Sequence, residues 1–122
     1  MIMVNTILKV ADNSGALRVK CIGLFNNKKR AEVGDVITTV VLKSYAQSKA
    51  KIKTSSIVKG VVVRTRKKQK RKNNVYVKFE DNAIVVIDDR KNPIGTRIFG
   101  AVASELRGKD FARIISLAPD II

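Results

Sequence analysis

The stretch from Ile57 to Ile87 decides the fold, and it reads IVKGVVVRTRKKQKRKNNVYVKFEDNAIVVI. The opening segment, Ile57–Val63, is rich in β-branched residues and is typical of a buried strand. The chain turns apolar again at Val75–Phe79, and a third run, Ala83–Ile87, re-enters the interior. These runs are too short for core helices, so the stretch predicts strands.

Between these apolar runs lies a densely cationic loop. Eight basic side chains and no acidic one occur from Arg64 to Lys78. The dipeptide Asn73-Asn74 suits a tight hairpin turn, because asparagine tolerates positive φ better than most non-glycine residues. A hairpin with apolar ends and a tip this cationic repels itself unless an anionic partner lies against it. We interpret it as a lever that inserts into nucleic acid.

The whole chain carries the same excess of positive charge. Its 122 residues, enough for one compact domain over residues 1–122, include 25 basic and 10 acidic side chains, a formal charge of +15. Residues 36–79 hold no Asp or Glu but 13 Lys and Arg. A polyanion is therefore the first partner to expect. A membrane surface also attracts such charge, but no basic amphipathic helix is present, so nucleic acid is favoured.

Cysteine and histidine usage excludes several classes of site. The single cysteine, Cys21, rules out an internal disulfide and a cysteine-based zinc site, and there is no histidine. Cys21 lies in the alternating segment Leu17–Leu24, which predicts a strand with Leu17 and Val19 on its inner face, so we interpret Cys21 as a packing residue rather than a reactive thiol. No run reaches the length of a membrane span, and neither a secretion signal nor a transit peptide is expected.

The remaining elements complete an all-β pattern with a small α part. Residues 11–16 have turn composition, and Phe79 and Phe99 are interpreted as core residues. Further strands are predicted at 6–10 and 36–43, and residues 101–122 show roughly helical spacing interrupted by Gly108. Ser104 or Asp110 could cap a short helix there. About five short strands followed by one or two short helices predict a small closed β-barrel, because closure removes vulnerable strand edges.

No enzyme signature survives inspection. Asp88 and Asp89 are adjacent and are interpreted as turn residues rather than a catalytic dyad. Gly95 and Gly100 have the spacing of a phosphate-binding loop, but the lysine and hydroxyl residue that should follow are absent. The pair at 80–81 is interpreted as a solvated turn rather than a magnesium site. We therefore expect no catalysis and no cofactor bound by the protein itself. The exception is structural magnesium carried by an RNA partner.

The basic side chains supply the chemistry that remains. Each phosphate they neutralise releases counterions, which gives an affinity that weakens with salt. Arg64 and Arg66 alternate with Thr65, so we expect them to share one strand face and to grip phosphates bidentately. With only six aromatic residues, base stacking is a weak expectation, and folded RNA fits better than single strands. The predicted RNA-binding residues are Arg18, Lys20, Lys28, Lys29, Arg30, Lys43, Lys49, Lys51, Lys53, Arg64, Arg66, Lys67, Lys68, Lys70, Arg71, Lys72 and Lys78.

Six motifs follow one another along the chain: Val10–Ala16, Gly34–Ile37, Val62–Thr65, Asp81–Ala83, Gly95–Gly100 and Ile115–Pro119. Together they resemble the ribosomal large-subunit protein fourteen family, and the resemblance is collinear over the chain. Asn74 stands where the family has glycine, and asparagine can also occupy the left-handed region.

The resemblance implies a five-stranded barrel with a projecting β-ribbon and a C-terminal loop with short helices. It also implies a non-catalytic place in the large ribosomal subunit, bound to its ribosomal RNA and bridging to small-subunit RNA, in a bacterial cytoplasm or in an organelle (mitochondrion or plastid). The implied neighbours are large-subunit proteins three and nineteen and a ribosome-silencing factor. The positions that match the factor and intersubunit contact are Thr96, Arg97 and Arg113, the last standing where relatives often carry lysine.

Two other functions stay open on sequence alone. The first is a free single-strand-binding barrel that acts as a nucleic-acid chaperone, which predicts protein that stays free of large subunits on sedimentation. The second is a regulatory docking module, which predicts that the C-terminal loop binds protein partners without RNA.

Overall fold

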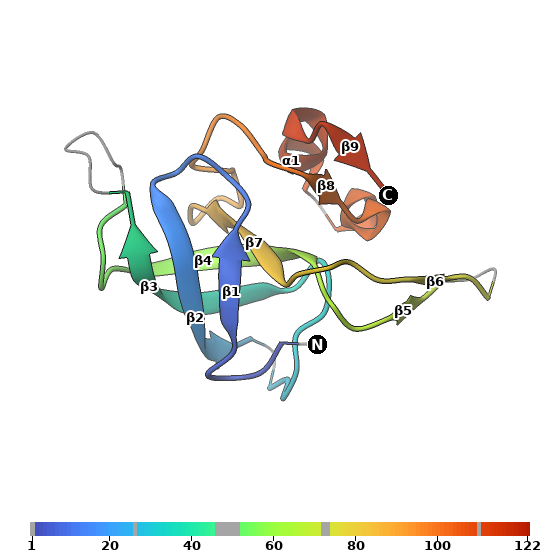
Figure 1. Cartoon of the computed structure of the whole chain (residues 1–122), viewed down its shortest axis with the longest axis horizontal. Coiled ribbons are helices and arrows are strands. Elements are labelled where there is room, and N and C mark those ends of the chain that lie inside the picture. The colour runs from blue at the N-terminus through green and yellow to red at the C-terminus, as the bar shows by residue number, and fades with distance from the viewer. Residues whose placement is uncertain (1, 26, 46–51, 72–73, 110) are drawn as a thin grey trace.

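The computed structural model describes residues 2–25, 27–45, 52–71, 74–109 and 111–122. Its secondary structure is mostly β-sheet, with one short α-helix and one 3-10 turn, as the sequence predicts (Figure 1). The elements in chain order are β1 (Ile7–Val10), β2 (Ala16–Leu24), β3 (Val36–Ser44), β4 (Ile57–Arg64), β5 (Gln69–Lys70), β6 (Tyr76–Val77), β7 (Ala83–Ile87), β8 (Ala101–Val102), η1 (Ser104–Gly108), α1 (Ala112–Leu117) and β9 (Asp120–Ile121).

Five strands close into a barrel in the order β1-β2-β3-β4-β7. The pairs from β1 to β4 are antiparallel, as is β4 with β7, and β1 closes the barrel by pairing in parallel with β7. The closing register aligns Lys9 with Ala83 and Val10 with Ile84. The predicted closed five-stranded barrel is therefore confirmed, and closure leaves its strands without free edges.

Each of the five barrel strands contributes buried side chains to the interior of the barrel. Leu8, Val19, Ile37, Val62 and Ile84 are each at most 1% exposed and belong to one cluster. Cys21 is buried in the same cluster, and burial raises the pKa of its thiol, so it packs rather than reacts, as predicted. Leu17 is half-buried, because register shifts interrupt the alternation of β2.

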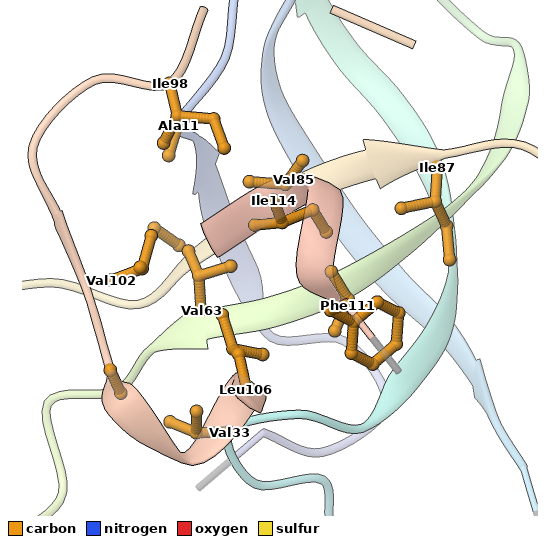
Figure 2. Packing of buried hydrophobic residues seen from close by; sticks show 13 residues of the cluster. Ala11, Val33, Val63, Val85, Ile87, Ile98, Val102, Leu106, Phe111 and Ile114 are labelled. Atoms are coloured by element: carbon orange, nitrogen blue, oxygen red, sulfur yellow. The ribbon is translucent and has the colours of Figure 1, made fainter. Parts of the chain in front are cut away.

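A second core lies between the outer face of the barrel and the C-terminal segment. Val63 of β4 and Val85 of β7 pack with Leu106 of η1 and with Phe111 and Ile114 near α1 (Figure 2). Val61-Val62-Val63 thus alternates between the two cores, and all five residues of β7 are buried. This explains why both strands read as continuous apolar runs rather than as apolar–polar alternation.

The cationic segment forms a two-stranded antiparallel ribbon, β5–β6, that projects away from the barrel (Figure 1). Asn74 has a φ of 61°, the left-handed conformation that its turn position requires. At the base of the ribbon, the Phe79 amide donates to the Thr65 carbonyl at 3.0 Å. The predicted strand at 75–79 is shorter than expected: only Tyr76 and Val77 pair, and Val75 is exposed.

The C-terminal elements are short, as predicted, but their caps differ from the prediction. Ala103, not Ser104, is the N-cap of η1, and no side chain caps it. The predicted cap Ser104 is therefore wrong, because the 3-10 turn begins at that residue. Asp110 lies outside the described residues, and α1 follows with Phe111 as N-cap. Its end at Leu117 precedes Pro119, which cannot continue a helix.

Candidate nucleic-acid interface

The ribbon and its base present a group of exposed cations. Arg66, Lys67, Lys68, Lys70 and Lys78 are all exposed. Because the ribbon projects from the barrel, these charges meet solvent rather than other parts of the described chain (Figure 1). Five like charges over so short a segment create a strongly positive potential that attracts a polyanion.

Arg71 is the ribbon residue that departs from this pattern. Its Nε lies 2.6 Å from Glu105 Oε1 and its Nη2 lies 3.3 Å from Glu105 Oε2, and both side chains are only about a quarter exposed. This bidentate pair joins the ribbon to η1 and leaves less of the Arg71 charge for a ligand. Lys72 lies outside the described residues.

Arg64 is also held inside the protein, which corrects the expectation that it shares an exposed face with Arg66. Its Nε lies 3.0 Å from Asp81 Oδ1, and its Nη1 donates to the carbonyls of Phe99 at 3.1 Å and Ala101 at 3.2 Å. Its side chain is 13% exposed. The strand ends at Arg64, so the two-residue alternation on which the expectation depended does not continue to Arg66.

Gly100 provides the space for this guanidinium. A Cβ at Gly100 would lie 2.3 Å from Arg64 Nη1, and the residue has a φ of +78°. Both facts require glycine at this position. Asp81, which we interpreted as part of a solvated turn, is the ion-pair partner of Arg64, and its side chain is 27% exposed. No group of three or more His, Cys, Asp or Glu residues that could hold a metal occurs within the described ranges.

The other predicted RNA-binding residues are distributed over the barrel wall and its loops. Arg18, Lys29, Arg30, Lys43 and Lys53 are exposed, and Lys20 is half-buried. Lys28 is exposed but lies 3.0 Å from Asp35, so part of its charge is matched. Lys49 and Lys51 fall outside the described residues. The structure thus brings Arg66–Lys70 together on the ribbon and leaves the barrel-wall cations dispersed.

A buried carboxylate holds the turn at 11–16 in place. Asp12 is 2% exposed; its Oδ1 accepts from the Ser14 amide and hydroxyl, and its Oδ2 accepts from the Val86 amide at 2.9 Å. Burial raises the pKa of Asp12 above its ordinary value of 3.8, although these hydrogen bonds oppose the shift. Asp12 therefore links the turn to strand β7.

Asn13 then fixes the loop that carries two predicted contact residues. Its Oδ1 accepts from the amides of Thr96 at 2.8 Å and Arg97 at 3.0 Å, and its Nδ2 donates to Thr96 Oγ1 at 2.9 Å. A Cβ at Gly95 would lie 2.7 Å from Asn13 Oδ1, so this approach also needs glycine. Sequence reasoning treated residues 11–16 only as a turn, because nothing local shows a partner 83 residues away.

The residues predicted to contact the small subunit and the silencing factor lie on two segments that pack against the same buried cluster. Thr96, Arg97 and Arg113 are all exposed. Ile98, next to Arg97, and Ile114, next to Arg113, are buried in the same outer core cluster (Figure 2). The exposed residues are therefore carried by rigid neighbours, which suits a surface that recognises a partner by shape.

The aromatic residues are more exposed than predicted. Phe99 is 45% exposed and lies beneath the Arg97 guanidinium, 5.9 Å from Cζ to the ring centroid, so its assignment to the core was wrong. Phe79 is half-buried and packs against the outer core cluster, as expected. Phe25, Tyr45 and Tyr76 are also exposed. Unpaired bases stack on exposed aromatic rings that lie beside cations. Base stacking is therefore a stronger expectation for this chain than the sequence alone suggested.

The chain's acidic turn has a structural function. Asp88 Oδ1 accepts hydrogen bonds from the amides of Arg90 at 2.8 Å and Asn92 at 2.9 Å, which confirms the interpretation of Asp88 as a turn residue.

Among the helices that the structure describes, none is long and apolar enough to cross a membrane.

A closed β-barrel with a cationic ribbon and dispersed basic loops defines the class of small, strongly basic β-barrel proteins. The family comparison makes this specific. The profile of the family described as ribosomal protein L14p/L23e matches residues 1–122. The chain belongs to this family of large-subunit ribosomal proteins, whose role is structural rather than enzymatic, and its place is the large ribosomal subunit.

Proposed function

We propose that the chain binds large-subunit ribosomal RNA through its ribbon and basic loops. The observation that carries the proposal is the projecting ribbon, whose exposed residues Arg66, Lys67, Lys68 and Lys70 face solvent without an acid among residues 65–79. RNA is held here by its phosphates, because the charges are too many and too exposed for recognition of single base edges.

The salt dependence of binding tests this proposal. Changing Lys67, Lys68 and Lys70 together to alanine removes three phosphate contacts, so the slope of log affinity against log salt for large-subunit RNA should fall by about 2 to 3. The matched control changes the same three residues to arginine, which keeps the charge and should keep the slope. An unchanged slope in the alanine variant would show that the ribbon does not touch phosphate.

We propose that the surface of Thr96, Arg97 and Arg113 contacts small-subunit RNA at bridges and receives the ribosome-silencing factor that the family resemblance implies. The support is the clamped loop: Asn13 holds the backbone of 96–97, and Arg64 binds the carbonyls of Phe99 and Ala101. Charge reversal by Arg97→Glu should impair subunit joining on sucrose gradients while large subunits assemble normally. Arg90→Glu, an exposed reversal in the 88–93 turn, is the control; unfinished particles in the Arg97 variant would reject this division.

Large-subunit proteins three and nineteen remain proposed neighbours. Cross-linking of assembled subunits followed by mass spectrometry tests both contacts, and the absence of links to either protein would reject them.

A second function, a free single-strand-binding chaperone, gains support from the exposed rings of Phe25, Tyr45, Tyr76 and Phe99. Sedimentation separates the two functions. Co-migration with large subunits through moderate salt supports the ribosomal function, and protein that stays at the top of the gradient supports the chaperone.

A further inference from the structure

A pocket lies apart from the ribbon, between the end of β2, the 28–36 loop and the 87–91 turn. Its volume is about 390 Å³. Its apolar wall is formed by Leu24, Val36, Ile87 and Phe111. Phe111 and Ile87 also belong to the outer core cluster, so this wall is held by packing that exists without a ligand (Figure 2). A volume in this range accepts a molecule of a few tens of atoms, not a duplex.

The polar lining carries an excess of positive charge. Five basic and three acidic side chains line the pocket. Asp35 is matched by Lys28 at 3.0 Å and by Lys109 at 3.9 Å, and Asp89 by Lys59 at 3.5 Å.

The third acid, Asp88, accepts two amides of its own turn. The exposed cations Arg30 and Lys91 then remain without an ion pair among the described residues. The pocket therefore suits a ligand with one anionic group.

Phe25 supplies a flat surface at the rim. Phe25 is 40% exposed as a residue, and Lys59 Nζ lies 5.8 Å from the centroid of its ring. An exposed ring beside a cation and next to an apolar wall offers stacking and hydrophobic contact to a planar group. A nucleotide combines a planar base, which suits the Phe25 ring and the apolar wall, with an anionic phosphate, which suits the cations Arg30 and Lys91.

We propose that this pocket takes one unstacked nucleotide of RNA, with its base against Phe25 and the apolar wall and its phosphate toward Arg30 and Lys91. The inference rests on the proposed binding of ribosomal RNA and adds a site for a single base to the phosphate contacts of the ribbon. Unpaired nucleotides in loops and bulges can be splayed out in this way, whereas paired ones cannot.

The test uses the full chain and purified large-subunit ribosomal RNA. Phe25→Leu keeps an apolar side chain but removes the ring and should weaken binding about tenfold, whereas Phe25→Trp should bind as wild type does. Ile57→Ala is the control, because it truncates an exposed apolar side chain outside the pocket and should leave affinity unchanged. Thermal melts establish that all variants are folded.

Ultraviolet cross-linking of assembled large subunits gives an independent readout. After digestion with nuclease and trypsin, a nucleotide adduct on the peptide 21–28 supports the proposal. An adduct with a peptide of another protein at Phe25 overturns it in favour of a protein partner. Equal RNA affinity of wild type and Phe25→Leu overturns it while the proposed RNA function stands.

Two further outcomes can be distinguished, one from NMR titration with free nucleotides and one from RNA binding by the wild-type chain. Adenosine and uridine 5′-monophosphate that shift the NMR signals of Phe25 without competing with ribosomal RNA would identify the pocket as a free-nucleotide site and overturn the RNA assignment. A wild-type chain that binds no ribosomal RNA would overturn the proposed function and this inference together.

Discussion

The ribbon and the loop at 94–101 differ in how charge and position are combined. The ribbon carries many exposed cations. Among its described residues, the contacts with the rest of the chain include the Phe79–Thr65 backbone bond at its base, the Arg66 amide on Asn82, and the Arg71–Glu105 pair. The loop has a single cation, Arg97, yet Asn13 and Arg64 fix its backbone at both ends.

The difference matches the two kinds of recognition that we propose for this chain. Attraction of a polyanion depends on the number of charges and tolerates movement of the side chains that carry them. Recognition of a defined partner needs a surface held by hydrogen bonds and packing. Arg64 and Arg66 are only two residues apart, yet Arg64 is held inside the protein and Arg66 is exposed to solvent.

The largest expected effect comes from Arg64. Arg64→Ala leaves two carbonyls without their donor and leaves Asp81 only Lys9, at 3.9 Å, so it should lower the free energy of unfolding by about 3 kcal/mol. Arg66→Ala, at an exposed position, should change it by less than about 0.5 kcal/mol. Urea denaturation measures both. Similar stabilities for the two variants would remove the distinction between an internal and a ligand-facing arginine.

A smaller effect is expected at Asp12, which supports the loop through the adjacent Asn13. Asp12→Asn replaces one acceptor oxygen by an amide nitrogen, leaves a buried N–H unpaired, and should cost about 1 to 3 kcal/mol. Because the folded pKa of Asp12 is raised, the folded state binds its proton more tightly than the unfolded state. The contribution of Asp12 to stability should therefore fall as the pH rises from 3.8 through the folded pKa.

The difference in unfolding free energy between wild type and Asp12→Asn isolates this titration, since the other carboxylates are common to both. That difference should shrink as the pH rises over this window. A difference that grows with pH would show that the ionised carboxylate is the form that the fold favours.

Among Arg64, Asp12 and Asn13, the smallest effect on stability is expected at Asn13. Asn13→Ala removes three exposed hydrogen bonds to Thr96 and Arg97 and should cost about 1 kcal/mol. Its effect on subunit joining should nevertheless resemble that of Arg97→Glu, because the loop loses its defined position. Hydrogen exchange at the amides of 96 and 97 should accelerate in the variant. Unchanged exchange would mean that Arg64 and the backbone hydrogen bonds to residues 11–13 hold the loop without the Asn13 side chain.

Much of the fold could be predicted from local pattern. The β-branched runs of β4 and β7 indicate buried strands, and the alternation in β2 indicates one inward face. The cationic hairpin follows from charge and from the asparagines of its turn. The exposure of Arg66, Lys67, Lys68 and Lys70 could also be predicted, since so many neighbouring like charges cannot be buried together.

The partners of individual polar residues could not be predicted in this way. Arg64 and Arg66 look alike in sequence, but Asp81 and Gly100 exist beside only one of them. Phe99 reads as a core residue, but the clamped loop leaves its ring outside. The sites of Asn13 and of the Phe25 pocket are built from segments far apart in the chain, so no local signal marks them.

The sequence by itself therefore determined the strands of the barrel, the ribbon and the positive charge of the chain, because strand periodicity and charge are properties of neighbouring residues. Only the tertiary structure decided which cations stay free, which loop is rigid and where a pocket opens. The physical reason is that hydrogen bonds, ion pairs and burial depend on distances between residues that closure of the barrel brings together.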